Sequence, residues 1–171
     1  GAGKSTLIKI LTGVYAPDAG QVTVAGQPLE FHDVRDARQH GVVALYQELS
    51  IVPTISVAEN IMLGGDTPRR GLVDWGELYR RAQHQLDRLN QRIPVRRLAG
   101  RLSPVQQTMV AIARALTAEA KVLILDEPTA ALTDTEIIDL FAVLRALRDE
   151  GVAIIYVSHR LEEVFELCDR L

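Results

Sequence analysis

Three short runs of almost uninterrupted apolar residues restrict the folds open to this chain more than any other feature. They occupy residues 41–45, 121–125 and 152–157, and segments with helical periodicity separate them. A strand that is apolar at every position has to bury both of its faces, which is typical of parallel sheets with helices on both sides. The sequence therefore predicts an α/β fold with a mostly parallel sheet flanked by helices.

Six segments carry the signals of helices, and the clearest begins at Thr133. Thr133 and Glu136 have the spacing of a capping box, apolar residues recur on one stripe, and Gly151 is a stop signal. Between about residue 53 and residue 100 the strand signal disappears. We therefore expect one domain, with a helical subdomain at 53–117 inserted into a core formed by 1–52 and 118–171. The predicted helices span residues 5–12, 57–63, 75–90, 104–117, 133–150 and 161–167.

Composition excludes several classes of protein. The 171 residues are 47% hydrophobic and 24% charged, which is ordinary for one globular domain. The formal net charge of -3 lacks the basic excess of proteins that bind nucleic-acid backbones. The longest apolar runs are far shorter than the roughly 20 residues that cross a bilayer. The single Cys168 cannot form an internal disulfide, and no export signal is visible. We predict a cytoplasmic protein with no membrane span and no nucleic-acid partner.

The chain opens with the run Gly1-Ala2-Gly3-Lys4-Ser5-Thr6, the second half of the phosphate-loop pattern G-x-x-x-x-G-K-[ST]. Glycines let backbone N–H groups surround phosphate oxygens, and a helix that begins near Lys4 directs its positive end at them. Lys4 adds a positive charge, Ser5 is a ligand type for Mg²⁺, and Thr6 is a donor for the α-phosphate. The alternative is a Gly-Lys-Ser helix start that holds no ligand. Because the pattern starts before Gly1, we expect this chain to be part of a longer one.

Two adjacent acids, Asp126 and Glu127, follow the apolar run at 121–125. Carboxylates at the end of a buried strand are unfavourable unless a positive group lies near them, and a Mg²⁺–ATP complex provides that charge. We predict that Asp126 holds Mg²⁺, directly or through water, and that Glu127 is the general base for the attacking water. The alternative is that the two acids cap a turn before Pro128.

Two further polar residues follow the other predicted strands. His159 comes after the run at 152–157, and Gln47 comes after the run at 41–45 with Tyr46 between them. Ligands of open α/β sheets bind at the carboxyl ends of the strands. His159 is therefore a candidate donor to the γ-phosphate or the attacking water, and Gln47 a candidate ligand of Mg²⁺ and water. The alternatives are a histidine that starts a helix before Arg160 and an ordinary loop glutamine.

Taken in their order along the chain, these residues resemble those of the nucleotide-binding subunit of an ATP-binding-cassette (ABC) transporter. The resemblance covers essentially the whole chain. The resemblance implies the fold of a P-loop NTPase with a helical subdomain, and ATP hydrolysis. Finer similarity points to bacterial importers of monosaccharides such as ribose, galactose, xylose and arabinose, in stretches 47–50, 56–61, 106–107, 130–134 and 158–165. The matching motifs are the phosphate loop, Gln47 as Q-loop, 102–106 with Ser103 and Gln106 as signature, Asp126 and Glu127 as Walker B, and His159 as H-loop.

Two positions depart from the usual pattern of that family. Pro104 and Val105 replace the two glycines of the signature, and Thr133 stands where many cassettes have an aspartate. Ser103 and Gln106 also have the spacing of a capping box, with proline at the first helical position. A well-capped helix start is therefore one interpretation of this segment. The other is a helix N-terminus that binds the γ-phosphate of an opposing subunit, and the two interpretations are compatible.

The resemblance implies partners and a place in the cell. Two cassettes close head to tail around ATP, so that one supplies the Lys4 side and the other the Ser103 side of each site. The region around Gln47 transmits the motion to transmembrane permease subunits, which receive solute from a periplasmic sugar-binding protein. In monosaccharide importers two cassettes are fused in one chain, so this chain is expected to be an N-terminal fragment at the cytoplasmic face of the inner membrane. The alternatives are transport of another small solute, such as a nucleoside, and a soluble ABC protein without a transport role.

Overall fold

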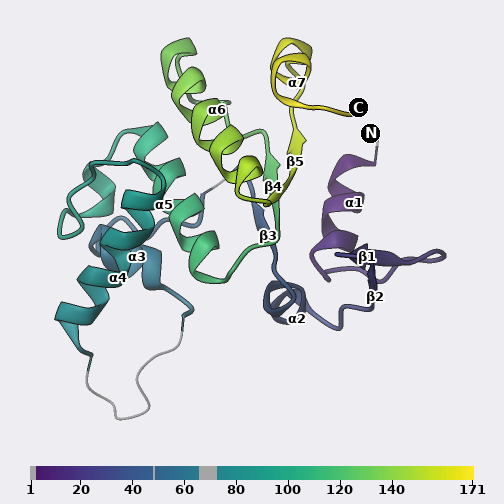
Figure 1. Cartoon of the computed structure of the whole chain (residues 1–171), viewed down its shortest axis with the longest axis horizontal. Helices are drawn as coiled ribbons and strands as arrows, with labels where there is room; N and C mark the ends of the chain where they lie inside the picture. Colours follow the sequence, from purple (N-terminus) through teal and green to yellow (C-terminus); the bar gives the residue numbers. More distant parts are fainter. Residues whose placement is uncertain (1–2, 48, 66–72) are drawn as a thin grey trace.

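The computed structural model describes residues 3–47, 49–65 and 73–171 (Figure 1). Its centre is a parallel three-stranded sheet in the order β3-β4-β5. Each strand lies within one residue of a predicted apolar run, which confirms the predicted α/β architecture. The strands are β3 (Val42–Leu45), β4 (Val122–Asp126) and β5 (Ala153–Val157).

Burial differs along the sheet. Leu123, Ile124 and Leu125 of the central strand β4 are fully buried. Ala153 of β5 is exposed and the other residues of that strand are half-buried. The expectation that all three strands are buried on both faces is therefore wrong for β5. The physical reason is that β5, like β3, is an edge strand among the described residues.

All six predicted helices are present, and their ends lie within two residues of the predicted ones. A seventh, α2, was not predicted; the side chain of Asp33 accepts a hydrogen bond from the Asp36 amide and caps its start. The helices are α1 (Lys4–Leu11), α2 (Val34–Gln39), α3 (Val57–Met62), α4 (Trp75–Arg88), α5 (Pro104–Thr117), α6 (Asp134–Asp149) and α7 (Leu161–Leu167). Among the residues with described placement, none of these helices is both long and apolar enough to cross a membrane.

Helices cover the sheet on two sides. On one side, Ile124 packs with Ile8 of α1 and Ala37 of α2. On the other, Leu123 and Leu125 pack in a larger core that includes α5 and α6. Figure 1 shows α1 and α2 on the opposite side of the sheet from α5 and α6. Alternate residues of β4 thus serve two different cores, which explains why the whole strand is apolar.

The start and end of α6 follow the predicted signals. Thr133 and Glu136 form a capping box, and Gly151 adopts a left-handed φ of 94° just beyond the helix. The predicted apolar stripe is buried in full. α3 and α5 also begin with capping boxes, so the one predicted at Ser103 is confirmed. The stripe consists of Ile137, Leu140, Phe141, Leu144 and Leu147.

A short antiparallel hairpin precedes α2 and was not predicted. It pairs β1 (Val22–Val24) with β2 (Gln27–Leu29). The turn between them has positive φ at both residues, 51° at Ala25 and 78° at Gly26, as in the type I′ turns that join twisted strands. Three-residue strands are too short to show alternation, so the sequence pattern did not reveal them.

The helices α3, α4 and α5 pack together beside the sheet (Figure 1). Arg114 of α5 fixes the chain that enters this group. Its guanidinium donates to the Ser50 carbonyl at 2.8 Å, the Asn60 carbonyl at 2.7 Å and the Asn60 side-chain oxygen at 3.2 Å. Burial, and next the charge of Arg38, lower the pKa of Arg114. Arg114 therefore ties the segment after Gln47 to the helices.

Candidate active site

The parallel sheet brings four of the predicted site residues to one edge: Gln47, Asp126, Glu127 and His159. Asp126 is the last residue of β4 and is in register with Val157, the last residue of β5. His159 follows β5 by two residues, and Gln47 follows β3 by two residues. Because parallel strands end at the same edge, polar residues separated by more than a hundred positions in the sequence become neighbours.

Glu127 and His159 form a pair at this edge. The His159 Nδ1 atom lies 3.3 Å from Glu127 Oε2, and the side chains are 67% and 28% exposed, respectively. The Glu127 amide donates to the Val157 carbonyl at 2.8 Å, which joins the ends of β4 and β5. Glu127 has a φ of 50°, in the left-handed region where a side chain costs about 1 kcal/mol. The fold thus holds this carboxylate beside the imidazole in spite of local strain.

The electrostatics of Asp126 indicate an excess of negative charge. Burial, and next the adjacent Glu127, raise the pKa of the Asp126 carboxyl, whereas Lys4 acts in the opposite direction. Lys4 is therefore near enough to interact with the acid pair. Two adjacent carboxylates with one nearby lysine form a site that a further cation would stabilise.

The start of α1 presents unused donors. Gly3, at a left-handed φ of 75°, precedes the helix, and no side chain among the described residues caps it. A Cβ atom on Gly3 would meet nothing within 4 Å, so the backbone conformation alone calls for glycine. Lys4, Ser5 and Thr6 are exposed beside the first-turn amides. The two remaining residues of the predicted loop, Gly1 and Ala2, lie outside the described residues.

A cavity of about 510 Å³ joins the Q-loop segment to Glu127. Gln47, Glu127 and Pro104 of α5 are among the residues that line it. Ser103 and Gln106, within the described part of the chain, do not line it. They bond to each other, since the Ser103 amide donates to Gln106 Oε1 at 3.2 Å and the Gln106 amide to Ser103 Oγ at 3.4 Å. Gln47 and Glu127 therefore line one cavity together with Pro104, the residue that follows Ser103.

These residues fit Mg²⁺ and a nucleotide phosphate. An uncapped helix start with an adjacent lysine is suited to an anion. The oxygen atoms of Ser5, Gln47 and Asp126 are the hard ligands that Mg²⁺ prefers. Burial and the adjacent Glu127 raise the pKa of Asp126, so a bound cation would favour its ionised form.

A buried cluster behind this edge was not predicted from the sequence. Glu163 of α7 is only 4% exposed and accepts hydrogen bonds from the hydroxyls of Thr129, Tyr156 and Ser158. Thr129 follows Glu127 by two residues, and Ser158 directly precedes His159. The only signal in the sequence was the presence of hydroxyl residues close to both site residues, which many loops share.

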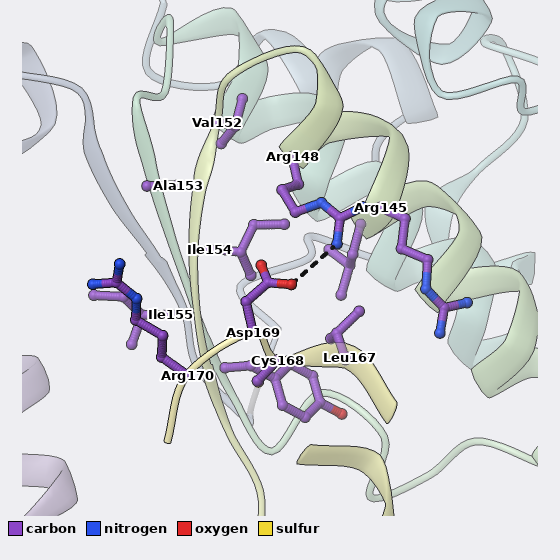
Figure 2. Close-up of a pocket in the computed structure, with 12 residues that line it drawn as sticks. Arg145, Arg148, Val152, Ala153, Ile154, Ile155, Leu167, Cys168, Asp169 and Arg170 are labelled. Carbon is purple, nitrogen blue, oxygen red and sulfur yellow. Dashed lines mark ion pairs between the residues drawn. The ribbon is translucent and has the colours of Figure 1, made fainter. Parts of the chain in front are cut away.

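A second cavity lies away from the site. It has a volume of about 440 Å³ and runs along β5 between α6 and residues 167–170 (Figure 2). Figure 2 shows Arg148 directed at Asp169, and the two charged groups are 3.7 Å apart. None of the predicted site residues lines this cavity. This cavity is therefore separate from the predicted site.

Proteins of similar sequence are known. Residues 1–130 match the family model of the ABC transporter. The ribose import ATP-binding protein RbsA of Geobacillus kaustophilus (strain HTA426) is 48% identical over 173 residues, which cover 100% of this chain and 35% of that protein. The ribose import ATP-binding protein RbsA 1 of Rubrobacter xylanophilus is 47% identical, with coverage of 100% and 34%. The chain thus spans about a third of the length of the curated relatives it matches.

Solved structures share the fold. A nucleotide-free ATP-binding cassette from an ABC transporter superposes with a TM-score of 0.84 at 27% identity, covering 98% of this chain and 70% of that one. A dimeric bacterial ABC transporter cassette gives a TM-score of 0.73 at 25% identity, with coverage of 94% and 72%. The fold is that of the ABC cassettes, which are P-loop NTPases. By this fold and by its match to the family model, the chain belongs to the ABC transporter family and is one of its ATP-binding domains.

Proposed function

We propose that this chain binds Mg²⁺–ATP, hydrolyses it, and so powers the import of a sugar, a monosaccharide, across the cytoplasmic membrane. One observation carries the hydrolysis: Glu127 and His159 are paired at 3.3 Å next to Asp126, at the edge where β4 and β5 end. The sugar is supported by two relatives at 47–48% identity that are named ribose import ATP-binding proteins.

The phosphates of ATP bind at the start of α1 in this proposal. The uncapped amides of the first turn and the Lys4 ammonium group donate to the phosphate oxygens, together with the Thr6 hydroxyl. The backbone of Gly3, which precedes the helix, belongs to the same loop, and the predicted loop residues Gly1 and Ala2 lie outside the described residues. Ser5, Gln47 and Asp126 hold Mg²⁺, which supplies positive charge to the phosphates and to the acid pair.

Glu127 and His159 act on the γ-phosphate. The Glu127 carboxylate accepts a proton from a water molecule, whose oxygen bonds to the γ-phosphorus as the bond to the bridging oxygen breaks. The electron pair of that bond leaves with ADP. His159 faces Glu127 through Nδ1, and in the imidazolium form, in which both ring nitrogens carry a hydrogen, Nε2 donates to the γ-phosphate. Gln47, which shares a cavity with Glu127, orients the water.

Ser103 and Gln106 serve the nucleotide of a partner cassette in this proposal. They lie at a capped helix start whose first residue, Pro104, lines the Gln47–Glu127 cavity, although Ser103 and Gln106 themselves do not line it. A helix N-terminus that faces a second molecule binds the γ-phosphate held there. The division into a P-loop core, 1–52 and 118–171, and a helical subdomain at about 53–117 lets this part of the cassette move against the core.

The proposed partners follow from the import reaction. They are a second cassette, fused downstream in the same protein, transmembrane permease subunits, and a periplasmic sugar-binding protein that acts indirectly. The dimer formed by a similar bacterial cassette supports the pairing. The protein then lies at the cytoplasmic face of the inner membrane as a peripheral subunit.

Replacement of the base tests the hydrolysis. In the intact protein reconstituted with its permease, we expect Glu127→Gln to retain ATP binding and to lower kcat by about 100-fold or more. Glu119→Gln is the matched control, because Glu119 also has a positive φ, 51°, but lies before β4 at the opposite end of the strand. Turnover of Glu127→Gln at the rate of the unmutated protein would exclude Glu127 as the base.

ATP binding at the start of α1 and the identity of the transported solute are tested by separate measurements. We expect Lys4→Ala to weaken ATP binding while Lys9→Ala, at the other end of α1, leaves it unchanged. Equal affinities of both variants would contradict the phosphate site.

ATP-dependent uptake into vesicles by the reconstituted transporter, with panels of monosaccharides and nucleosides, tests the solute. Uptake of a nucleoside without uptake of any sugar would exclude the proposed import of a monosaccharide.

A further inference from the structure

Glu163 is the most completely buried acid of the described chain, with 4% of its surface exposed. Its two oxygens accept from hydroxyls of three residues. Tyr156 Oη lies 2.7 Å and Ser158 Oγ 2.8 Å from Glu163 Oε2, and Thr129 Oγ1 lies 2.9 Å from both oxygens. Arg160 adds an ion pair at 3.0 Å. A buried carboxylate with this many donors is fully satisfied, so its geometry is fixed.

The donors come from both segments that carry the reacting side chains. Thr129 lies two residues beyond Glu127, on the loop between β4 and α6, and is itself 4% exposed. Ser158 precedes His159 on the turn between β5 and α7. Its hydroxyl donates to Glu163 and accepts from the Arg160 amide at 3.0 Å, so it holds the backbone on both sides of His159.

From these contacts we infer that Glu163 is a positioning residue, which holds Glu127 and His159 at the distance that ATP hydrolysis requires. Glu163 does not line the cavity shared by Gln47 and Glu127. It acts through Thr129 on the loop of Glu127 and through Ser158 on the turn of His159. The inference rests on the proposed hydrolysis of ATP.

If Glu163 only stabilised the fold, loss of any one of its three hydroxyl donors would have the same effect on kcat. Tyr156 lies within β5, where pairing of that strand with β4 already fixes the backbone. Thr129 and Ser158 lie outside the strands, on segments whose course depends more on side-chain contacts. Loss of the Tyr156 hydroxyl therefore removes a bond to Glu163 without releasing either reacting side chain. Loss of the Thr129 hydroxyl releases the loop of Glu127, and loss of the Ser158 hydroxyl releases the turn of His159.

Variants of the intact, reconstituted protein that lack one hydroxyl or the charge of Glu163 test this distinction. We expect Thr129→Val, Ser158→Ala and Glu163→Gln each to lower kcat by about tenfold or more, because small misplacements of reacting groups are costly. The affinity for ATP should stay within about twofold, because none of these residues is assigned to phosphate binding. Tyr156→Phe and Glu162→Gln, an exposed neighbour on α7, are the matched controls and should keep kcat within about twofold.

A double-mutant cycle identifies the residue through which Ser158 acts. In a His159→Ala background, Ser158→Ala should lower the remaining kcat by less than about twofold, because the group that it positions has been removed. An equal factor in both backgrounds would overturn the inference. So would unchanged kcat in Thr129→Val and Ser158→Ala, or an equal loss in Tyr156→Phe. Absence of ATP hydrolysis by the unmutated protein would instead overturn the proposed function, and this inference with it.

Discussion

Glu127 shows at the scale of one residue how strain and chemistry are combined. Its φ of 50° lies where glycine is favoured, yet a carboxylate occupies the position and faces His159 at 3.3 Å. Glycine would relieve about 1 kcal/mol of backbone strain here but would remove the only side chain that pairs with His159 among the described contacts. The strained conformation brings this carboxylate to the edge where the strands end.

The pH dependence of stability follows from the surroundings of Glu163. Burial on its own would raise the pKa of Glu163, but hydrogen bonds from Tyr156, Ser158 and Thr129, together with Arg160, outweigh it and lower that pKa below 4.5. A lowered acid pKa stabilises the fold above the unfolded-state value, and the contribution is lost as the pH falls through the folded-state pKa. Thus Glu163 stabilises the protein at neutral pH and loses this effect below about pH 4.5.

Hydrogen exchange in the intact protein measures this contribution. We expect Glu163→Gln to reduce the protection of the α7 amides at about pH 7, and the difference from the unmutated protein to shrink toward about pH 3.5. Glu162→Gln controls for the loss of one negative charge on the same helix. A difference that stays constant across this range would show that charge on Glu163 does not stabilise the fold.

The site residues that could be predicted from the sequence are those that stand at or just after the end of a strand. Asp126 and His159 each stand at or just beyond the end of an apolar run, and the parallel sheet then makes them neighbours. Glu163 and its donors were not predicted to form a cluster. Their contacts join three elements, and the sequence of one short helix does not distinguish a buried glutamate from a solvated one. Whether the predicted residues have the proposed roles stays a prediction.

At the scale of elements, the helices and strands with strong local signals were predicted correctly from the sequence. β4 is apolar because both of its faces are covered, and α6 has a cap, a stripe and a stop signal. The hairpin of β1 and β2 was missed because its strands have three residues each, with Pro28 inside one of them and Ala25 in the turn. α2 was missed because only Val34 and Ala37 of its six residues are apolar, whereas α3 has four apolar residues in the same length, although the Asp33 cap was visible in the sequence.

Two glycines test how α1 is joined to the segment that follows it. Gly13 and Gly20 both have positive φ, 74° and 85°, so alanine strains the backbone at either one by about 1 kcal/mol. At Gly13 the new Cβ would also lie 2.5 Å from the Asp33 carbonyl oxygen, whereas at Gly20 it meets nothing within 4 Å. Gly13→Ala should therefore destabilise α1 by about 2 kcal/mol more than Gly20→Ala. Equal protection of the α1 amides against exchange in the two variants would contradict this close contact.

Arg114 acts at the scale of the whole molecule, because it bonds residues 54 and 64 positions away in the sequence. A lysine cannot make the same three contacts with one ammonium group. We expect Arg114→Lys to speed exchange of the Val52 amide, which donates to the Asn60 side chain, by about tenfold. Arg88→Lys is the control, since Arg88 joins Glu150 over 62 positions by an exposed ion pair of small value. Equal effects would show that Arg114 does not hold the segment after Gln47.

The order of strands in the sheet also has a consequence for protein synthesis. β3 ends at Leu45, but β4, with which it pairs, begins at Val122, after α3, α4 and α5. A chain that emerges from the ribosome therefore completes three helices before β3 can reach its register with β4. Those helices make contacts that are local in sequence and form quickly, while the sheet waits for long-range pairing. A pause in translation just before Val122 would thus expose the strand that later carries Gln47 into the site.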